Sequence, residues 1–456
     1  MSLSSILSIA RSALLTHQRA MAVTAHNVAN AQTPGYTKQT LSLVAETPLF
    51  TPDGQIGRGV TDNGVTRARN QFFDSAYRRE SGLLGNSSTM RDLLGEVEAA
   101  INEPSDTGIS SALDGLFQSF GDLANDPASR TNRDMVRSSA ERFAQRLHTL
   151  DTQITQVTTE TADRLRSDVG SANQLASQIA ALNVEILSTR GGEQSAPDVE
   201  DQRDLLVDQL SSLMDVRVLP QSDGTISVVA GDTMLVEAGT AHTVELKPIP
   251  AGGFGVGIQG NNALIQLQGG SIKALSDLTS NELPSLRGRL DTFTQTIVEE
   301  VNRIHRAGYT PAGATGVDFF DPAGVTARTI RLSDAVAASG DAIAASGTGA
   351  SGDNAVALQL AQLAHSGVAT IGGKTLRDFY TDIASSVGVG VSDATNDAWV
   401  HQSLVDHADS MRSSTSGVSI DEEMVNLIAQ QEAYSAASRM VQTANEMVQT
   451  ILNMMG

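Results

Sequence analysis

The 456-residue chain has no cysteine, few aromatic residues and no long apolar run. Without cysteine it can form no disulfide, no thiolate metal site and no cysteine nucleophile. Aromatic residues make up only 4% of the chain, so its cores must be mainly aliphatic, which suits packed helices. No stretch of about 18 apolar residues is present, so we expect no transmembrane helix and no insertion into a membrane.

Positive charge is also scarce. Lysine and arginine number 31 against 52 aspartates and glutamates, which gives a formal net charge of -21. Nucleic-acid binding needs a basic face that displaces counterions from phosphate, and docking on anionic lipid also needs positively charged residues. We therefore expect no nucleic-acid partner, and we attribute the acidic surface to solubility.

No motif predicts catalysis or metal binding. The histidines show no His-Glu-x-x-His frame, and no Gly-x-Ser-x-Gly elbow occurs. Residues 373–375 (Gly-Lys-Thr) resemble the end of a phosphate-binding loop, but the glycine that should precede them is one place off. Residues 255–260 fit the dinucleotide pattern by letter, but strand-like residues follow where a helix must begin. We expect no catalytic residue, metal or cofactor, and a protein that is not an enzyme.

The two ends of the chain carry matching heptad stripes, in which apolar residues recur at alternating steps of four and three. The N-terminal stripe is Leu3, Leu7, Ala10, Leu14, His17, Met21, Thr24 and Val28. The C-terminal stripe is Met424, Leu427, Tyr434, Ala437, Val441, Ala444, Val448, Ile451 and Met455. A helix of this kind can bury its stripe only against a partner, so we predict that the terminal helices pair as a coiled coil.

Helical spacing and turn residues divide the rest of the chain. Helices are predicted over residues 66–103, 107–124, 131–189, 198–213, 271–306, 354–366 and 375–413. Residues 37–65 look extended and irregular because glycines punctuate them. Short β-branched runs are predicted to be strands at residues 216–219, 226–229, 234–236, 243–246, 255–258, 263–267 and 329–332.

The predicted fold is therefore mainly α, with a long helical bundle as its body and an inserted small antiparallel β domain. Residues 1–65 and 411–456 are predicted to form a terminal coiled-coil domain with an extended segment. Residues 66–213 and 271–410 are predicted to form the helical body, and residues 214–270 the β domain.

Residues 27–30 read Asn-Val-Ala-Asn, and residues 33–36 read Thr-Pro-Gly-Tyr. Together with the preceding helix they resemble the N-terminal signature of the bacterial flagellar rod, hook and hook-associated proteins. Residues 417–424, 430–434 and 442–447 resemble the matching C-terminal signature. The two signatures stand at the two ends of the chain, in the order that this family has.

The middle of the chain resembles the members of that family found at the hook–filament junction. Four segments carry this resemblance: residues 201–211, residues 302–309 with 316–320, residues 352–355 and residues 103–108. Longer members carry an additional outer domain that has no counterpart here, so its roles do not transfer to this chain.

The resemblance implies a structural subunit that is exported by the flagellar type III route without signal cleavage and acts outside the cell. Residues 1–7 have no basic stretch before an apolar one, so they do not predict a cleaved secretory signal. The subunit would polymerise at the distal end of the hook and provide the base for the filament. The alternatives are another axial subunit, such as a rod or hook protein, or an exported protein with an unrecognised activity.

The implied partners are copies of the same chain in a helical polymer or ring, hook protein below, and the second junction protein and filament above. An export chaperone and the type III export apparatus are implied as well. The chaperone is expected on the C-terminal helix, whose methionines suit a surface that repacks against different partners. The alternative is that this stripe forms an intramolecular core only.

The expected assembly residues lie in the two terminal signatures. At the N-terminus they are Leu3, Leu7, Leu14, Met21, Asn27, Val28, Asn30, Pro34, Gly35 and Tyr36. On the C-terminal helix the expected assembly or chaperone residues are Met424, Leu427, Tyr434, Val441, Met447, Val448, Ile451 and Met455.

Two interpretations stay open for the polar residues of the N-terminal motif. The amides of Asn27 and Asn30 either end the helix locally, because they compete for backbone hydrogen bonds, or bond to neighbouring subunits. Pro34 and Gly35 set a turn out of the helix, and Tyr36 packs on its own domain or across an interface.

Overall fold

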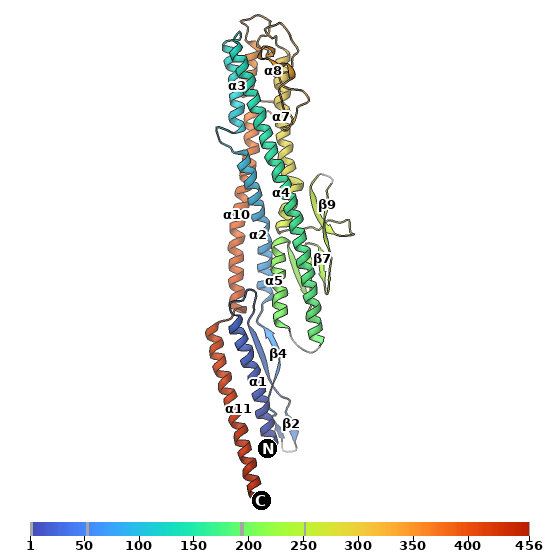
Figure 1. Cartoon of the computed structure of the whole chain (residues 1–456), viewed down its shortest axis with the longest axis vertical. Helices are drawn as coiled ribbons and strands as arrows, with labels where there is room; N and C mark the ends of the chain where they lie inside the picture. Colours follow the sequence, from blue (N-terminus) through green and yellow to red (C-terminus); the bar gives the residue numbers. More distant parts are fainter. Residues whose placement is uncertain (1–2, 52–53, 192–195, 250–251, 456) are drawn as a thin grey trace.

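Long helices that lie along one axis make the protein a rod, with a narrow pair of terminal helices at one end (Figure 1). The computed structural model describes residues 3–51, 54–191, 196–249 and 252–455. The terminal pair is α1 (Leu3–Asn30) and α11 (Ile420–Met455). The fold class is confirmed: a helical bundle, a small antiparallel β region, and terminal helices that pair.

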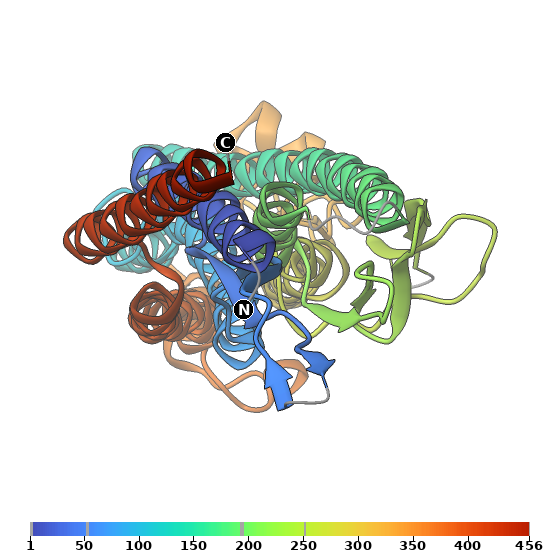
Figure 2. The same ribbon diagram turned by 90° about the horizontal axis from the view of Figure 1, so that it is seen from below.

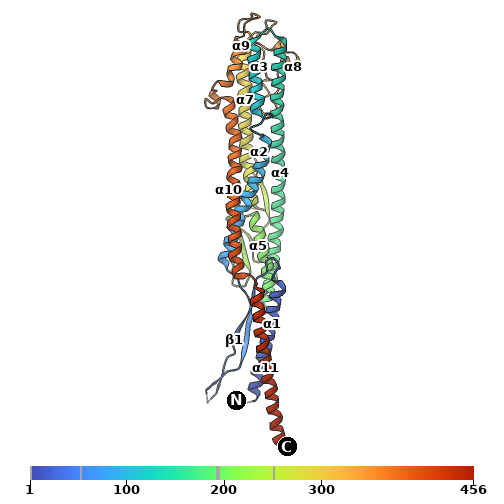
Figure 3. The same ribbon diagram turned by 90° about the vertical axis from the view of Figure 1, so that its left-hand side faces the viewer.

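The body is built from helices, the longest of which run beside one another along it (Figure 3). They are α2 (Gln71–Ile101), α3 (Ile109–Asn125), α4 (Arg130–Gly191), α5 (Pro197–Leu213), α6 (Ser271–Asp277), α7 (Leu283–Arg306), α8 (Asp334–Ala338), α9 (Ala355–Gln362) and α10 (Leu376–Ser416). A π-helical turn, Leu278–Glu282, joins α6 to α7, so the helix predicted over residues 271–306 is continuous. Short 3-10 turns lie at Gly340–Ala342, Leu363–His365 and Ala369–Ile371.

Side-chain caps explain where two of the long helices begin. Asn70 accepts a hydrogen bond from the amide of Phe72 at the start of α2. Thr375 accepts one from the amide of Asp378 at the start of α10. Each cap satisfies an amide that has no partner inside its helix, which fixes the first turn.

One continuous core of buried aliphatic residues runs along the body. Three of its largest members stack where α4, α7 and α10 meet, with Phe293 of α7 between Phe143 of α4 and Tyr380 of α10. The ring centroids are 6.4 Å and 5.3 Å from that of Phe293. Phe120, Phe319 and Phe320 form a second buried group, so the large aromatic side chains of the core gather at two places.

The β region packs against the side of α4 and shares the core of the body (Figure 1). Its four-stranded antiparallel sheet has the order β5-β6-β7-β8, and β9 pairs with β10 beside it. The strands are β5 (Val216–Pro220), β6 (Ile226–Ala230), β7 (Thr233–Glu237), β8 (Thr240–Ala241), β9 (Val244–Pro248) and β10 (Phe254–Ile258). Asn183 of α4 anchors the sheet, because its amide donates to the carbonyls of Ile226 and Ala238 at 2.8 and 2.7 Å.

Two of the predicted strands are wrong. Residues 263–267 form no strand; they run beside β10, where the amide of Ile265 donates to the carbonyl of Val256. Residues 329–332 make one isolated bridge, between Leu332 and Phe320. In both places the apolar residues serve the core of the body, and burial there does not require a strand.

Residues 37–65 are extended as predicted, but they are not irregular. β1 (Gln39–Ala45) pairs with β4 (Val60–Arg67), and β2 (Leu49–Thr51) pairs with β3 (Gly54–Ile56), so the segment is a long hairpin. It lies along α1, where the Thr16 hydroxyl donates to the carbonyl of Val60 and Arg19 pairs with Asp62 at 2.8 Å. Pairing with α1 orders a segment whose glycines suggested a loop.

The terminal helices run antiparallel, because both chain ends lie at the same end of the rod (Figure 1). Small residues line their contact, among them Ala10, Ala437 and Ala444, which are all buried. His17 of α1 and Gln430 of α11 meet at 2.6 Å across it. Within the described residues, no helix has the length and apolar character needed to cross a membrane.

Replacing Phe293 by alanine is expected to lower the free energy of unfolding by about 3–5 kcal/mol, because a cavity would remain among rigid helices. Chemical denaturation of the purified chain measures this change. Phe72→Ala is the matched control, since 75% of the Phe72 side chain is exposed and its loss should cost less than about 0.5 kcal/mol. Equal effects of the two substitutions would contradict this description of the core.

Candidate functional site

The terminal pair meets the body at a joint, which we define as Asn27, residues 35–39 and the charged cluster described below. The chain crosses the joint between β4 and α2, at residues 68–70, and returns between α10 and α11, at residues 417–419. The amide of Lys38 donates to the carbonyl of Ser416, and the amide of Ala68 donates to the carbonyl of Lys38, so the backbone of Lys38 ties the two crossings together. Figure 3 shows the narrow pair beginning where α10 ends.

Asn27 lies at the centre of the terminal side of the joint and is only 1% exposed. Its Nδ2 donates to the carbonyl of Gln39 and to the Glu423 carboxylate, both at 2.8 Å. Its Oδ1 accepts from the Tyr36 hydroxyl at 2.7 Å and from the Gln39 amide at 3.0 Å. One buried side chain therefore fastens α1 to the turn after it, to β1 and to the first turn of α11.

Asn30 behaves differently, although it stands in the same motif. Its amide donates to the carbonyl of His26, one turn back, and accepts from the Thr33 hydroxyl at 3.1 Å. These are contacts that end a helix, so the local interpretation accounts for Asn30. For Asn27 the hydrogen bonds are also intramolecular, but they join three separate elements.

The turn after α1 needs the residues that the motif supplies. Gly35 has φ of +80°, and a Cβ there would lie 3.3 Å from the Cβ of Leu205 on α5, so a side chain is disfavoured on both grounds. Tyr36 packs edge-on against His26, with the ring centroids 5.5 Å apart. Burial, with the nearby carboxylates of Asp198 and Asp201, raises the pKa of Tyr36, so its hydroxyl stays a donor to Asn27.

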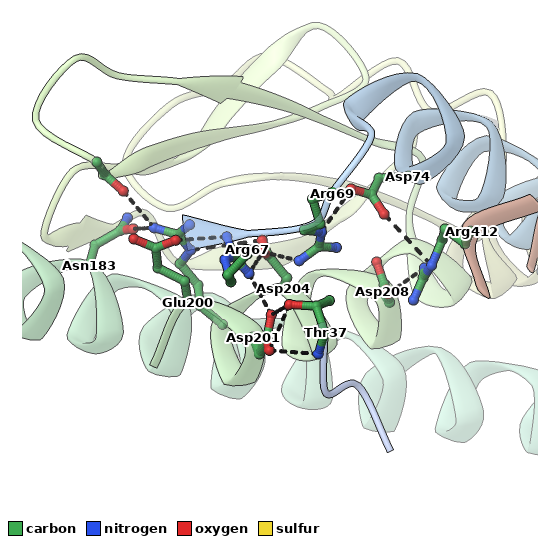
Figure 4. A network of polar contacts seen from close by, with 12 residues as sticks. Thr37, Arg67, Arg69, Asp74, Asn183, Glu200, Asp201, Asp204, Asp208 and Arg412 are labelled. Carbon is green, nitrogen blue, oxygen red and sulfur yellow. Dashed lines mark hydrogen bonds and ion pairs between the residues drawn. The ribbon is translucent and has the colours of Figure 1, made fainter. Parts of the chain in front are cut away.

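A cluster of arginines and carboxylates forms the body side of the joint (Figure 4). The arginines are Arg67, Arg69, Arg78, Arg203 and Arg412, and the carboxylates are Asp74, Glu200, Asp201, Asp204 and Asp208. They come from β4, from the residues between β4 and α2, from α2, from α5 and from the last turn of α10. This is the charged cluster.

Asp201 and Asp204 connect the two sides. The Asp201 carboxylate accepts from the amide and hydroxyl of Thr37 at 2.8 and 2.7 Å, and from Arg67 at 2.6 Å. Asp204 bonds to Arg67 at 2.9 Å and also to Arg69. Because these side chains are nearly all buried, each charge depends on its partners.

Asp208 and Asp74 extend the cluster to α10. Arg78 donates to Asp208 at 2.6 Å, and Arg412 donates to the same carboxylate at 2.7 Å. Arg412 also lies over the ring of Tyr77, 4.4 Å from its centroid. The end of α10 is thereby fixed to α2 and α5 immediately before the chain turns into α11.

The electrostatics of the cluster favour the charged forms. Burial alone would raise the pKa of Asp204, but the guanidinium groups of Arg69 and Arg67 more than offset this and hold it below its usual range. Burial would likewise lower the pKa of Arg67, but Asp204 and Asp201 raise it above its usual value. Asp204 and Arg67 are therefore both charged at neutral pH.

The apolar residues predicted for assembly divide into two groups. Leu7, Leu14, Met21 and Val28 of α1 are half-buried, as are Leu427, Val441 and Val448 of α11. Met424, Tyr434, Met447 and Ile451 are exposed, so this part of the predicted C-terminal stripe is not buried against α1. The side chains of Leu3 and Met455 lie outside the described residues.

α11 leaves many apolar side chains open to solvent. They are Ile420, Met424, Val425, Ile428, Tyr434, Met440, Met447, Ile451, Leu452 and Met454, each at least 38% exposed. So many large apolar side chains exposed on one helix usually mark an interaction site. We call this set the open face of α11.

The charged cluster was not predicted from the sequence. A signal was present, because Asp201, Asp204 and Asp208 recur at helical spacing in a helix whose other residues on that side are buried. Nothing in the spacing indicates their hydrogen-bond partners Arg67, Arg69, Arg78 and Arg412, which lie 130 or more residues away in the chain. No group of three or more histidines, aspartates and glutamates in the described part of the chain is arranged to hold a metal ion.

The chain is similar to known flagellar proteins over its whole length. Flagellar hook-associated protein 1 of Bacillus subtilis is 31% identical to it, and the match covers 99% of this chain and 98% of that protein. This chain belongs to the flagellar hook-associated protein 1 family. It is thus a structural subunit of the bacterial flagellum, at the hook–filament junction.

Other comparisons agree with membership of the hook-associated protein 1 family. Residues 94–320 match the helical domain of flagellar hook-associated protein FlgK, residues 7–37 match flagella basal body rod proteins, and residues 410–454 match the C-terminal region of basal body rod FlgEFG proteins. The hook-associated protein 1 of Salmonella typhimurium is 27% identical over 70% of this chain, a match that spans 59% of that protein.

A solved structure supports the fold. The flagellar hook junction protein FlgK from Burkholderia pseudomallei superposes with a TM-score of 0.66 at 17% identity, over 76% of this chain and all of that one. Membership of the axial family implies that the subunit polymerises with its own copies and has hook and filament subunits as neighbours.

Replacing Asp204 by asparagine is expected to lower the free energy of unfolding at pH 7 by about 3–5 kcal/mol, because it leaves buried guanidinium groups short of a charge. Asp163→Asn, which affects an exposed pair with Arg166, is the control and should cost less than about 1 kcal/mol.

The Asp204→Asn variant also tests how the free energy of unfolding depends on pH. The pKa of Asp204 is lower in the folded chain than in the unfolded one, where it is about 4. Its stabilisation is therefore complete above about pH 4 and is lost as the pH falls through the folded-state value. Denaturation between pH 7 and 2.5 should show a steeper acid loss for the wild type than for Asp204→Asn; parallel curves would contradict this role.

Replacing Asn27 by alanine is expected to loosen the terminal pair by about 1–3 kcal/mol, because the Tyr36 hydroxyl and the Gln39 amide lose their partner and Glu423 keeps Lys38 but loses its hydrogen bond to α1. Hydrogen exchange in β1 and the first turns of α11 measures this, and the core amides of the body serve as the internal reference. Asn30→Ala, which loses only local contacts, is the matched control and should change exchange in α11 little.

Proposed function

We propose that copies of this chain join at the distal end of the hook through the open face of α11. The single observation that carries this proposal is the row of exposed apolar side chains on α11, on a helix whose other side is already packed on α1. Burying such a row gives the favourable free energy that association needs. The proposed neighbours are copies beside and above, hook protein below, and the second junction protein and filament beyond.

The terminal pair is proposed to become fully ordered only on assembly. Its seam contains alanines and half-buried leucines, so it buries far less apolar surface than the body does. A long helix with one weak partner is marginal in water, and packing against further subunits would complete it. The body, with its continuous core, would stay folded throughout.

The proposed division of labour follows the domains predicted from the sequence. Residues 1–65 and 411–456 would form the assembly domain, and residues 66–213 and 271–410 would form a stiff body. The β domain, residues 214–270, would decorate the outside. Asn27 and Tyr36 would act by holding the two terminal helices in register, while Met424, Tyr434, Met447 and Ile451 would contact neighbours directly.

Export is the second element of the proposal. The chain would leave the cell by the flagellar type III route without signal cleavage and would function outside it. Before export a chaperone would cover the open face of α11, whose methionines adapt to more than one partner surface. No catalytic step is part of the proposed role, since the buried charges pair with one another and serve to position elements.

Removing the gene is expected to leave cells with bare hooks and to release flagellin into the medium. Electron microscopy of the cells and an assay of flagellin in the medium measure this. Missing hooks would instead indicate a rod or hook subunit, and normal filaments would contradict the proposed role.

Truncation after residue 419 is expected to abolish incorporation into the flagellum while the body keeps a cooperative thermal transition. A milder variant changes Met424, Val425 and Ile428 to serine. Its matched control changes Met135 and Leu358, exposed apolar residues of the body, to serine. Incorporation of the truncated chain would contradict assembly through α11.

A further inference from the structure

A groove lies between the start of α2 and β5, the edge strand of the four-stranded sheet. Its volume is about 400 Å³, and none of its lining residues belongs to the open face of α11. Its apolar lining includes Phe72, Ala76, Val216, Val218 and Val229. Phe72 is one of the most exposed large apolar side chains of the body, and an exposed aromatic ring at a groove is typical of a binding hot spot.

The rim of the groove is basic, on a chain with a net charge of -21. Arg79 and Arg217 both line it and are both exposed. Arg79 pairs with Glu80 at 2.8 Å, whereas Arg217 makes no ion pair or side-chain hydrogen bond with any described residue. Asp215, the acidic residue of the lining, accepts a hydrogen bond from the amide of Gln268. An acidic, apolar segment would complement this surface.

The first turns of α11 have that character. Ile420, Met424, Val425 and Ile428 are exposed, and Val425 is 67% exposed. Asp421 stands among them and makes no ion pair with the described residues, while Glu422 reaches Lys38 at 3.1 Å. This acidic, apolar ridge begins the open face of α11.

The ridge and the groove lie at the same level of the rod. Arg78 lines the groove and donates to Asp208, which also binds Arg412 in the last turns of α10. α11 begins at Ile420, four residues after the end of α10. Both features therefore flank the joint.

The elements that carry them, α11 and β5, lie on different sides of the rod. Seen along the rod, α10 and α11 lie on one side and the β region lies on the other (Figures 1 and 2). A copy that is rotated about an axis parallel to the rod can therefore present its ridge to its neighbour's groove. Such a contact joins two different surfaces, which is the kind of interface that builds rings and helices.

We propose that the first turns of α11 in one copy dock into the groove between α2 and β5 of the next copy around the junction. Val425 and Ile428 pack against Phe72, and the Asp421 carboxylate pairs with Arg217. This inference rests on the proposed function, because it names the lateral surface through which the subunits join. In this arrangement the β region forms part of the interface between subunits and does more than cover the outside of the assembly.

Cysteine cross-linking tests the contact directly, because the natural chain has no cysteine. Phe72→Cys and Val425→Cys are introduced together, flagella are isolated from cells that carry the variant, and mild oxidant is added. We expect a ladder of disulfide-linked multiples of the subunit. Each single variant, and the double variant as purified monomer, should give no ladder.

Filamented flagella without a ladder would overturn the inference and leave the proposed junction role intact. Normal filaments in cells that lack the gene would instead overturn the proposed function. The two failures are thus distinguishable.

A charge exchange tests the proposed pair of Asp421 and Arg217. It also tests the docking of α11 in the groove if the two cysteine substitutions block assembly. Arg217→Glu and Asp421→Arg should each reduce the number of filaments per cell by about tenfold. The two changes together should restore it. Arg328→Glu, at an exposed arginine in the segment before α8, which lies at the other end of the rod (Figure 1), is the matched control and should have no effect. Failure of the double variant to recover, with both monomers folded, would overturn the pairing.

Discussion

Arg67, Arg69 and Asp204 lie where water barely reaches, so each of these charges must face its partners whenever the protein is folded. The rest of the architecture depends on this constraint. The cluster takes its members from the hairpin, from α2, from α5 and from the end of α10, so a tilt of the terminal pair against the body would separate buried charges. The direction in which α11 leaves the body is therefore set by electrostatics as well as by the short connection at residues 417–419.

The two parts on either side of the joint are packed in different ways. In the body, Phe293 and Tyr380 are fully enclosed, and one core reaches from α2 to the β region. In the terminal pair, α1 buries one side on the hairpin and one on α11, while α11 has a large exposed side. Regions with few buried contacts open at lower free energy than a continuous core. A stiff rod with an adaptable end is what a subunit needs if it must fit between two different polymers.

Asn27 shows how one buried polar residue can hold the elements of the terminal pair together at the joint. Its amide uses both donor hydrogens and accepts twice from the same chain, and its partners belong to the turn after α1, to β1 and to α11. A hydrophobic residue at this point would pack, but it would not fix the register of the three elements. The hydrogen bonds of Asn27 do fix it, and they place the open face of α11 on a defined side of the rod.

The heptad stripes, the helix lengths and most of the strands could be predicted from the sequence, because period and turn residues are local properties. The residue signatures at 27–36 and 201–211 indicated the family. The long hairpin of residues 39–67 was not predicted, because its regular structure depends on packing against α1. Residues 263–267 and 329–332 were wrongly predicted as strands, because a short apolar run that is buried in the body has the same sequence pattern as a strand. The charged cluster could not be predicted: Asp201, Asp204 and Asp208 have helical spacing, but their arginines come from distant segments. The sequence by itself determined which residues are apolar and at what period they recur. Only the tertiary structure decided which charged residues pair and which apolar residues of α11 stay exposed, because both depend on contacts between residues far apart in the chain.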